Sequence, residues 1–212
     1  MPRPSLAIVD LGINNVKSIE KAFQSSFEDF ETKIIGKDGL TSNKPQLLVL
    51  PGVGAFGSGI TRLEKLNLYD QVRDFVDSGG ALVGICLGMQ LLGTRSDESP
   101  NFTGLEILQG ENKKLEFSEK NKVPRTGWDT VKFNSNSIFR NIKQADFYFN
   151  HSYHFVTNME RVTATALHGE REIAVAVQRG LVFGFQFHPE KSGKAGAALL
   201  QELSQVIWGY LK

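Results

Sequence analysis

The chain has 212 residues and a mass of 23.5 kDa, a size that predicts a single domain spanning residues 1–212. Hydrophobic residues make up 41% and charged residues 22%, with a net charge of +1, which excludes a disordered chain and a strongly basic nucleic-acid-binding protein. The sequence has neither a signal-peptide core nor the run of about 18 apolar residues that a membrane span needs. Cys86 is the only cysteine, which rules out an internal disulfide or a thiolate metal cluster and predicts a reducing compartment, the cytoplasm.

The first half of the chain alternates short apolar runs with helical spacing. Strands are expected at residues 5–10, 32–35, 47–50 and 81–85. Apolar residues at spacings of three and four predict helices from Val16 to Phe27 and from Leu63 to Phe75. This alternation predicts an α/β fold with an open, mostly parallel twisted sheet and helices on both faces.

The second half has short strand-like segments separated by turn residues. We expect these strands at residues 115–117, 129–133, 147–155, 162–167, 173–177 and 181–187. A final helix is predicted from Ala195 to Tyr210. The pattern is typical of an antiparallel portion added to the sheet.

Cys86 directly follows the strand at residues 81–85 and directly precedes a helical apolar pattern. Gly84 and Gly88 stand two residues to either side, where a tight strand-to-helix turn needs close approach of the backbone. A helix N-terminus favours the thiolate, and the backbone amide of Leu87 can donate to an oxyanion. Although a lone cysteine is usually a small buried hydrophobe, this spacing favours a nucleophile.

A thiol nucleophile needs a base and a group that orients the base. His188 ends the last predicted strand, and Pro189 and Glu190 follow it. Residues i and i+2 of an extended chain face the same way, so we expect the Glu190 carboxylate beside the His188 imidazole. His168 is interpreted as a solvated turn residue.

A metal site is not expected. His151 and His154 are three residues apart in a predicted strand, so their side chains are expected on opposite faces rather than chelating one ion.

A glycine-rich loop follows the third predicted strand. Gly52, Gly54 and Gly57 have the G-x-G-x-x-G spacing, but they follow a proline and lack the acidic residue of a dinucleotide site. Loops at the carboxyl ends of parallel strands converge on one crevice, so we expect this loop beside Cys86, with its amides completing an oxyanion hole.

Four segments, LPGVGAFG, GICLGMQLL, FYFNHSY and GFQFHPEKS, resemble the class I glutamine amidotransferases in this order and over the whole chain. The resemblance implies a Cys-His-Glu triad with Cys86 as nucleophile, His188 as base and Glu190 as orienter. It implies glutamine hydrolysis to glutamate and ammonia through a γ-glutamyl thioester, without a cofactor or a metal.

The same resemblance implies further site residues. Glutamine would be held by Gln90, Ser152 and Tyr153. The oxyanion amides would come from Gly52, Val53, Gly54 and Leu87. The partner interface and its gate would involve Asn15, Tyr148 and Lys191.

The length, the Gly127–Trp128 pair and HPEKS resemble the glutaminase subunits of imidazole glycerol phosphate synthase in histidine biosynthesis. That resemblance implies a heterodimer with a (β/α)₈ barrel cyclase that takes up ammonia. Asn14, Arg125 and Asp129 depart from the usual pattern, which leaves another acceptor open, such as a sugar amidotransferase. The alternatives are a catalytically silent scaffold and another cysteine hydrolase, such as a peptidase or a γ-glutamyl hydrolase.

Overall fold

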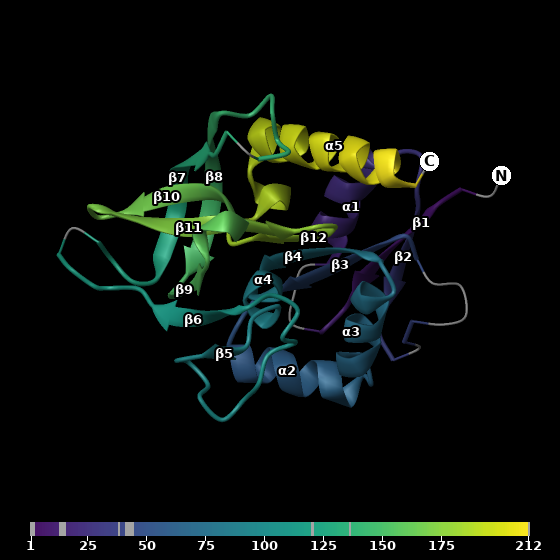
Figure 1. Ribbon diagram of the computed structural model, residues 1–212, viewed down its shortest axis with the longest axis horizontal. Coiled ribbons are helices and arrows are strands. Elements are labelled where there is room, and N and C mark those ends of the chain that lie inside the picture. The colour runs from purple at the N-terminus through teal and green to yellow at the C-terminus, as the bar shows by residue number, and fades with distance from the viewer. Residues whose placement is uncertain are drawn as a thin grey trace.

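The computed structural model describes residues 3–12, 16–37, 39–40, 45–119, 121–135 and 137–211. Within these residues, one large sheet runs through the molecule (Figure 1). Its strands are, in spatial order, β2 (Glu31–Ile35), β1 (Ser5–Val9), β3 (Leu47–Gly52), β4 (Ala81–Cys86), β12 (Val182–Phe185), β11 (Arg171–Arg179), β10 (Val162–His168), β7 (Arg125–Phe133) and β8 (Gln144–His151).

The direction of the strands changes in the middle of this sheet. Strands β2, β1, β3, β4 and β12 are parallel, whereas every pairing from β12 to β8 is antiparallel. The second half of the chain therefore extends the first sheet, and the predicted fold class is confirmed. A smaller sheet contains β5 (Arg95–Ser96), β6 (Gly110–Lys114) and β9 (Tyr153–Thr157).

Helices cover both faces of the parallel half. Helices α1 (Val16–Ser26) and α5 (Gly193–Tyr210) pack on one face, and α2 (Phe56–Lys65) and α3 (Tyr69–Asp77) pack on the other. Each helix contributes apolar side chains to one of two cores that the sheet separates, because each strand sends alternate residues to opposite faces.

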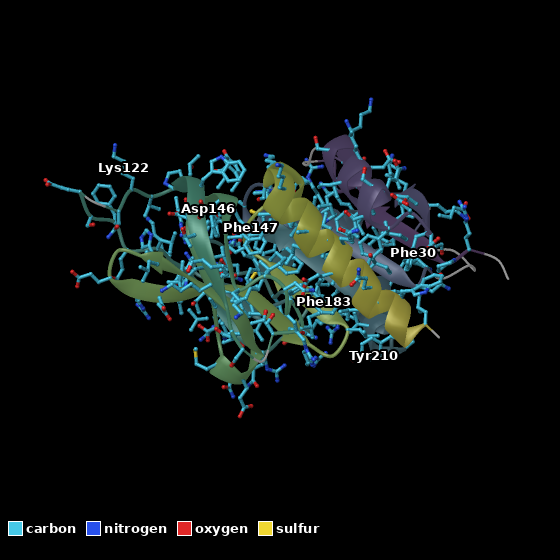
Figure 2. The ribbon with its side chains drawn as sticks, turned by 90° about the horizontal axis from the view of Figure 1, so that it is seen from above. Phe30, Lys122, Asp146, Phe147, Phe183 and Tyr210 are labelled. Carbon is cyan, nitrogen blue, oxygen red and sulfur yellow. The ribbon has the colours of Figure 1, made fainter. Side chains whose placement is uncertain are left out.

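Figure 2 looks down on α5, which lies across the sheet above the side chain of Phe183. Phe183 and Phe147 are fully buried in this core, whereas Tyr210 near the end of the helix is exposed. None of the described helices combines the length and the apolar character needed to cross a membrane.

The helix predicted from Leu63 to Phe75 is two helices. α2 ends at Lys65 and α3 begins at Tyr69. Between them Asn67 has φ of +54°, a left-handed conformation that asparagine adopts more readily than most residues and that ends a helix. The apolar spacing continues across the break because both helices pack on the same face of the sheet.

The strand predicted at 147–155 is also divided. β8 ends at His151 and β9 begins at Tyr153, and the two strands belong to different sheets. The strand predicted at 115–117 is wrong. The polar segment Gly110–Lys114 forms β6 instead, because it pairs with β9, a long-range contact that the local pattern does not reveal.

Candidate active site

Cys86 stands on a sharp turn between β4 and the short helix α4 (Leu87–Leu91). Its φ of +54° and ψ of −109° lie in a region that non-glycine residues rarely occupy. A Cβ on Gly88 would overlap the carbonyl oxygen of Leu50, and one on Gly84 would lie 2.8 Å from the backbone of Gly88. The two glycines therefore let the strands and the turn approach closely enough to fix the sulfur at the end of the sheet.

His188 and Glu190 follow the end of β12, the strand next to β4. The His188 Nδ1 lies 2.8 Å from Glu190 Oε1, and both side chains are almost fully buried. The pair forms within a 3₁₀ turn, Pro189–Lys191, and not along an extended chain as the sequence suggested. Ser192 holds this turn, since its hydroxyl donates to His188 O at 2.6 Å and accepts from Tyr148 N at 3.0 Å.

The surroundings of His188 favour its charged form. Burial by itself lowers the pKa of His188, but interactions with Cys86 and Glu190 outweigh it and raise the pKa to about 10. The buried Nε2 makes no hydrogen bond with the described groups, so we attribute the influence of the sulfur to electrostatic attraction. The site therefore holds His188 in its charged form beside the Cys86 sulfur.

Cys86 opens into a cavity of about 270 Å³. The predicted glutamine-binding residues Gln90, Ser152 and Tyr153 all line it, together with Leu87. Ser152 and Tyr153 reach the cavity because the chain passes there from β8 to β9. The break in the predicted strand at 147–155 thus supplies one wall of the site.

Glu98 lines the same cavity and was missed in the sequence. Its Oε2 accepts a 2.7 Å hydrogen bond from the backbone N of Phe56, the first residue of α2, where the helix dipole favours a carboxylate. A fixed negative charge in this position suits the α-ammonium group of an amino acid. Glu98 lies in an irregular loop with no motif or periodicity, so nothing in the local sequence distinguished it.

The glycine loop after β3 lies beside the nucleophile. Gly52 pairs with Cys86 in the register of β3 and β4, and Gly54, with φ of +101°, lines the cavity. The side chain of Val53 is 37% exposed and lines a neighbouring surface cavity. Leu87 begins α4, so its backbone amide starts a helix immediately after the sulfur.

Two of the three predicted interface residues lie together. Lys191 Nζ is 5.6 Å from the centre of the Tyr148 ring, and that ring is 6.3 Å from the ring of His188. Trp128, which is 57% exposed, packs edge-on against Tyr148 at 6.2 Å. Asn15 and the departure at Asn14 lie outside the described residues.

The other three histidines lie in strands: His151 ends β8, His154 is in β9, and His168 ends β10 where the sequence suggested a turn. His151 Nδ1 lies 2.8 Å from Tyr153 O, and burial lowers the pKa of His151 to about 3. His154 is on β9, and burial lowers its pKa to about 4. His168 Nε2 contacts Glu116 O at 2.8 Å. Among the described residues, no group of His, Cys, Asp and Glu side chains is arranged to hold a metal ion.

The two residues on β7 that depart from the usual family pattern contact each other. Arg125 Nε and Asp129 Oδ2 form a 2.6 Å ion pair, and the guanidinium lies 4.2 Å from the centre of the Phe149 ring. Arg125 is buried and directly opposite His151 across the strands, whereas Asp129 is about half exposed. The two departures therefore form one interacting unit next to the cavity wall.

The glutamine amidotransferase class-I family matches residues 7–204, so the chain belongs to the class I glutamine amidotransferases. It is 37% identical over 204 residues to the imidazole glycerol phosphate synthase subunit HisH of Moorella thermoacetica, with 95% of each chain covered. The Aquifex aeolicus subunit of the same name is also 37% identical, with 93% of this chain and 95% of the relative covered. Within the class, the chain thus belongs to the family of these HisH subunits. PurLQS from Thermotoga maritima shares the fold, with a TM-score of 0.71 at 20% identity over all of both chains.

Proposed function

We propose that this chain is the glutaminase subunit of imidazole glycerol phosphate synthase, acting in histidine biosynthesis. The glutaminase chemistry rests on the buried His188–Glu190 pair, 2.8 Å apart, at the end of the strand next to the one that presents Cys86. The assignment to this synthase rests on the HisH relatives. A silent scaffold would not need an uncommon backbone conformation at its only cysteine or a charged histidine next to it.

In the proposed reaction, Cys86 Sγ attacks the side-chain carbonyl carbon of glutamine. Backbone amides from Leu87 and the Gly52–Gly54 loop stabilise the oxyanion. The carbon–nitrogen bond breaks as the His188 imidazolium protonates the leaving nitrogen, which departs as ammonia. Water then attacks the thioester, the neutral His188 accepts its proton, and the carbon–sulfur bond breaks to release glutamate. Glu190 orients the imidazole throughout.

The rest of the site suits glutamine as the substrate. Gln90, Ser152 and Tyr153 supply polar groups along the cavity, and the carboxylate of Glu98 complements an α-ammonium group. These features favour an amino acid over the extended peptide of a protease. A γ-glutamyl hydrolase remains the nearest alternative chemistry, and glutamine hydrolysis separates the two.

We further propose that ammonia passes to a (β/α)₈ barrel cyclase bound next to the site, with Tyr148 and Lys191 near the interface. The names of the relatives describe subunits of a synthase, which supports a partner. We also propose that residues 1–212 form a single domain that works in the cytoplasm, where a lone reactive thiol stays reduced.

The test combines the purified chain with the cyclase subunit, glutamine and the phosphorylated ribulosyl substrate. We expect release of glutamate and formation of imidazole glycerol phosphate, and loss of both in the Cys86→Ala variant. Arg125 and Asp129, the ion pair that departs from the usual family pattern, make a partner that uses ammonia for a different acceptor the second candidate. Glutamate release without imidazole glycerol phosphate would favour that acceptor, and no glutamate release would refute the glutaminase.

A further inference from the structure

Gln186 is a buried polar residue with no role in the mechanism above. It directly follows β12, its side chain is fully buried, and it stands between Phe185 and Phe187 of the aromatic core. Its backbone N donates to Val175 O at 2.9 Å, which fixes the main chain at this point. Burying an amide side chain is unfavourable unless hydrogen bonds replace those to water, so the partners of this amide identify its role.

The Gln186 amide connects two residues of the active site. Gln90 Nε2 lies 3.0 Å from Tyr153 O and 3.1 Å from Gln186 Oε1. Gln186 Nε2 in turn lies 3.8 Å from Cys86 Sγ. A continuous path of hydrogen bonds therefore runs from a backbone carbonyl in the cavity wall, through two side-chain amides, to the sulfur.

The direction of these hydrogen bonds is determined at the Tyr153 end. A backbone carbonyl only accepts, so the Gln90 atom that faces it must be the nitrogen. One hydrogen of that nitrogen points to Tyr153 and the other to Gln186, which must present its oxygen. The remaining Gln186 atom, its nitrogen, therefore faces Cys86. Turning either amide over would place two donors or two acceptors against each other.

This direction has a consequence for the substrate side of Gln90. Both hydrogens of its Nε2 are used inside the protein, so its Oε1 is the atom suited to meet a ligand in the cavity. A carbonyl oxygen accepts from the side-chain NH₂ of glutamine and would repel the carboxylate of glutamate. The orientation imposed through Gln186 thus distinguishes the substrate from the product.

We propose that Gln186 is a positioning residue for the reaction at Cys86. Its oxygen fixes the amide of Gln90, and its nitrogen donates to the Cys86 thiolate. The proposal rests on the proposed glutaminase function and adds a residue to it. An N–H donor stabilises a charged sulfur more than a neutral thiol, so it increases the fraction of reactive thiolate.

The thiolate also has titratable neighbours, whose effects the test must separate from that of Gln186. They are His188, Glu190 behind it, and Glu98, His151 and Tyr153 along the cavity. Gln186 itself does not titrate, so replacing it changes the ionisation of Cys86 without removing a charge.

The experiment replaces Gln186 by methionine, an unbranched apolar residue of similar size that has no donor. Because Cys86 is the only cysteine, the rate of alkylation by iodoacetamide reports on it alone, and the reaction requires no glutaminase activity. In the Gln186→Met variant we expect the midpoint, the pH at which the alkylation rate is half-maximal, to rise by about one pH unit. At a pH below the midpoint, the rate should fall about tenfold, the size typical of one hydrogen bond to a charged group.

Gln178→Met is the matched control, because Gln178 lies on the neighbouring strand β11 and donates one side-chain hydrogen bond, to Gly180 O at 3.0 Å. It should keep the midpoint of the parent. The second measurement is the KM for glutamine in the complex, which we expect to rise in the Gln186→Met variant as Gln90 loses its fixed orientation. An unchanged alkylation midpoint in Gln186→Met would overturn the inference. If the midpoint rises in Gln186→Met but the parent protein itself has no glutaminase activity, the role of Gln186 is supported and only the proposed function is refuted.

Discussion

Replacing Gly196 by alanine should impair catalysis although Gly196 lies outside the cavity. Gly196 is in the first turn of α5, and a Cβ there would overlap the carbonyl oxygen of Pro189, the residue between His188 and Glu190. Cβ atoms essentially never approach another heavy atom within 3.0 Å. Restoring that separation requires a relative shift of roughly 1 Å between α5 and the 3₁₀ turn Pro189–Lys191.

The expected size of the effect follows from this shift. A misplacement of about 1 Å at a reacting group lowers the rate by about a hundredfold. Overpacking costs about 1 to 3 kcal/mol of the free energy of unfolding, which corresponds to a melting temperature lower by roughly 2 to 12 °C in a domain of this size. Glutamate release in the complex and thermal unfolding of the isolated chain measure the two effects.

Gly209 provides the control for this substitution. It is in the last turn of the same helix, it is exposed, and a Cβ there would meet nothing within 4 Å. Gly209→Ala should keep full activity and leave stability unchanged or raise it by up to about 1 kcal/mol, since alanine favours a helix. Parental activity and melting temperature in Gly196→Ala would refute the argument that α5 positions the turn Pro189–Lys191.

Three further predictions concern the site. Interactions with Cys86 and Glu190 raise the pKa of His188 to about 10. The stability that charged His188 gains from them is therefore fully present below about pH 6.5 and is lost as the pH rises through 10. The difference in melting temperature between the parent and Glu190→Gln should therefore shrink from pH 6.5 to 10, and a constant difference would contradict the charged pair. Glu98→Gln should raise KM for glutamine at least about tenfold and change kcat less, because the lost hydrogen bond to a charged group acts in the ground state. An unchanged KM would exclude contact between Glu98 and the α-ammonium group. The isolated chain should release glutamate at least about a hundredfold more slowly than the complex with its acceptor substrate, because one misdirected amide in the Gly52–Gly54 loop removes an oxyanion donor. Full activity of the chain alone would argue against regulation by this loop.

The parallel half of the fold could be predicted because its signals are local. Buried runs such as Leu47–Leu50 and the helical spacing of α1 depend only on neighbouring residues. The break at Asn67 was not predictable from spacing, because α2 and α3 keep the same buried face on both sides of it. Likewise, β6 is a polar segment whose strand conformation comes from its pairing with β9.

The same distinction applies to the site. The elbow at Cys86 and the His188–Glu190 pair are each contained in a few consecutive residues, and the structure places these two segments next to each other. Glu98 and Gln186 acquire their positions only through residues far away in the chain, namely Phe56 for the first and Gln90 for the second. Glu98 lies outside the four segments that carry the resemblance. Gln186 lies inside GFQFHPEKS, but that segment does not reveal its contact with Gln90.

The position of β12 has a consequence for the order in which the protein forms during synthesis. This strand lies between β4 and β11 in the middle of the sheet, yet Cys86 and Gln186 are 100 residues apart in the chain. Until residues 182–185 emerge from the ribosome, one side of β4 has no strand to pair with, and an unpaired apolar edge invites aggregation. His188, the proposed base, comes three residues after this strand, so a nascent chain completes its sheet and acquires that histidine in almost the same step. An incomplete chain therefore cannot consume glutamine.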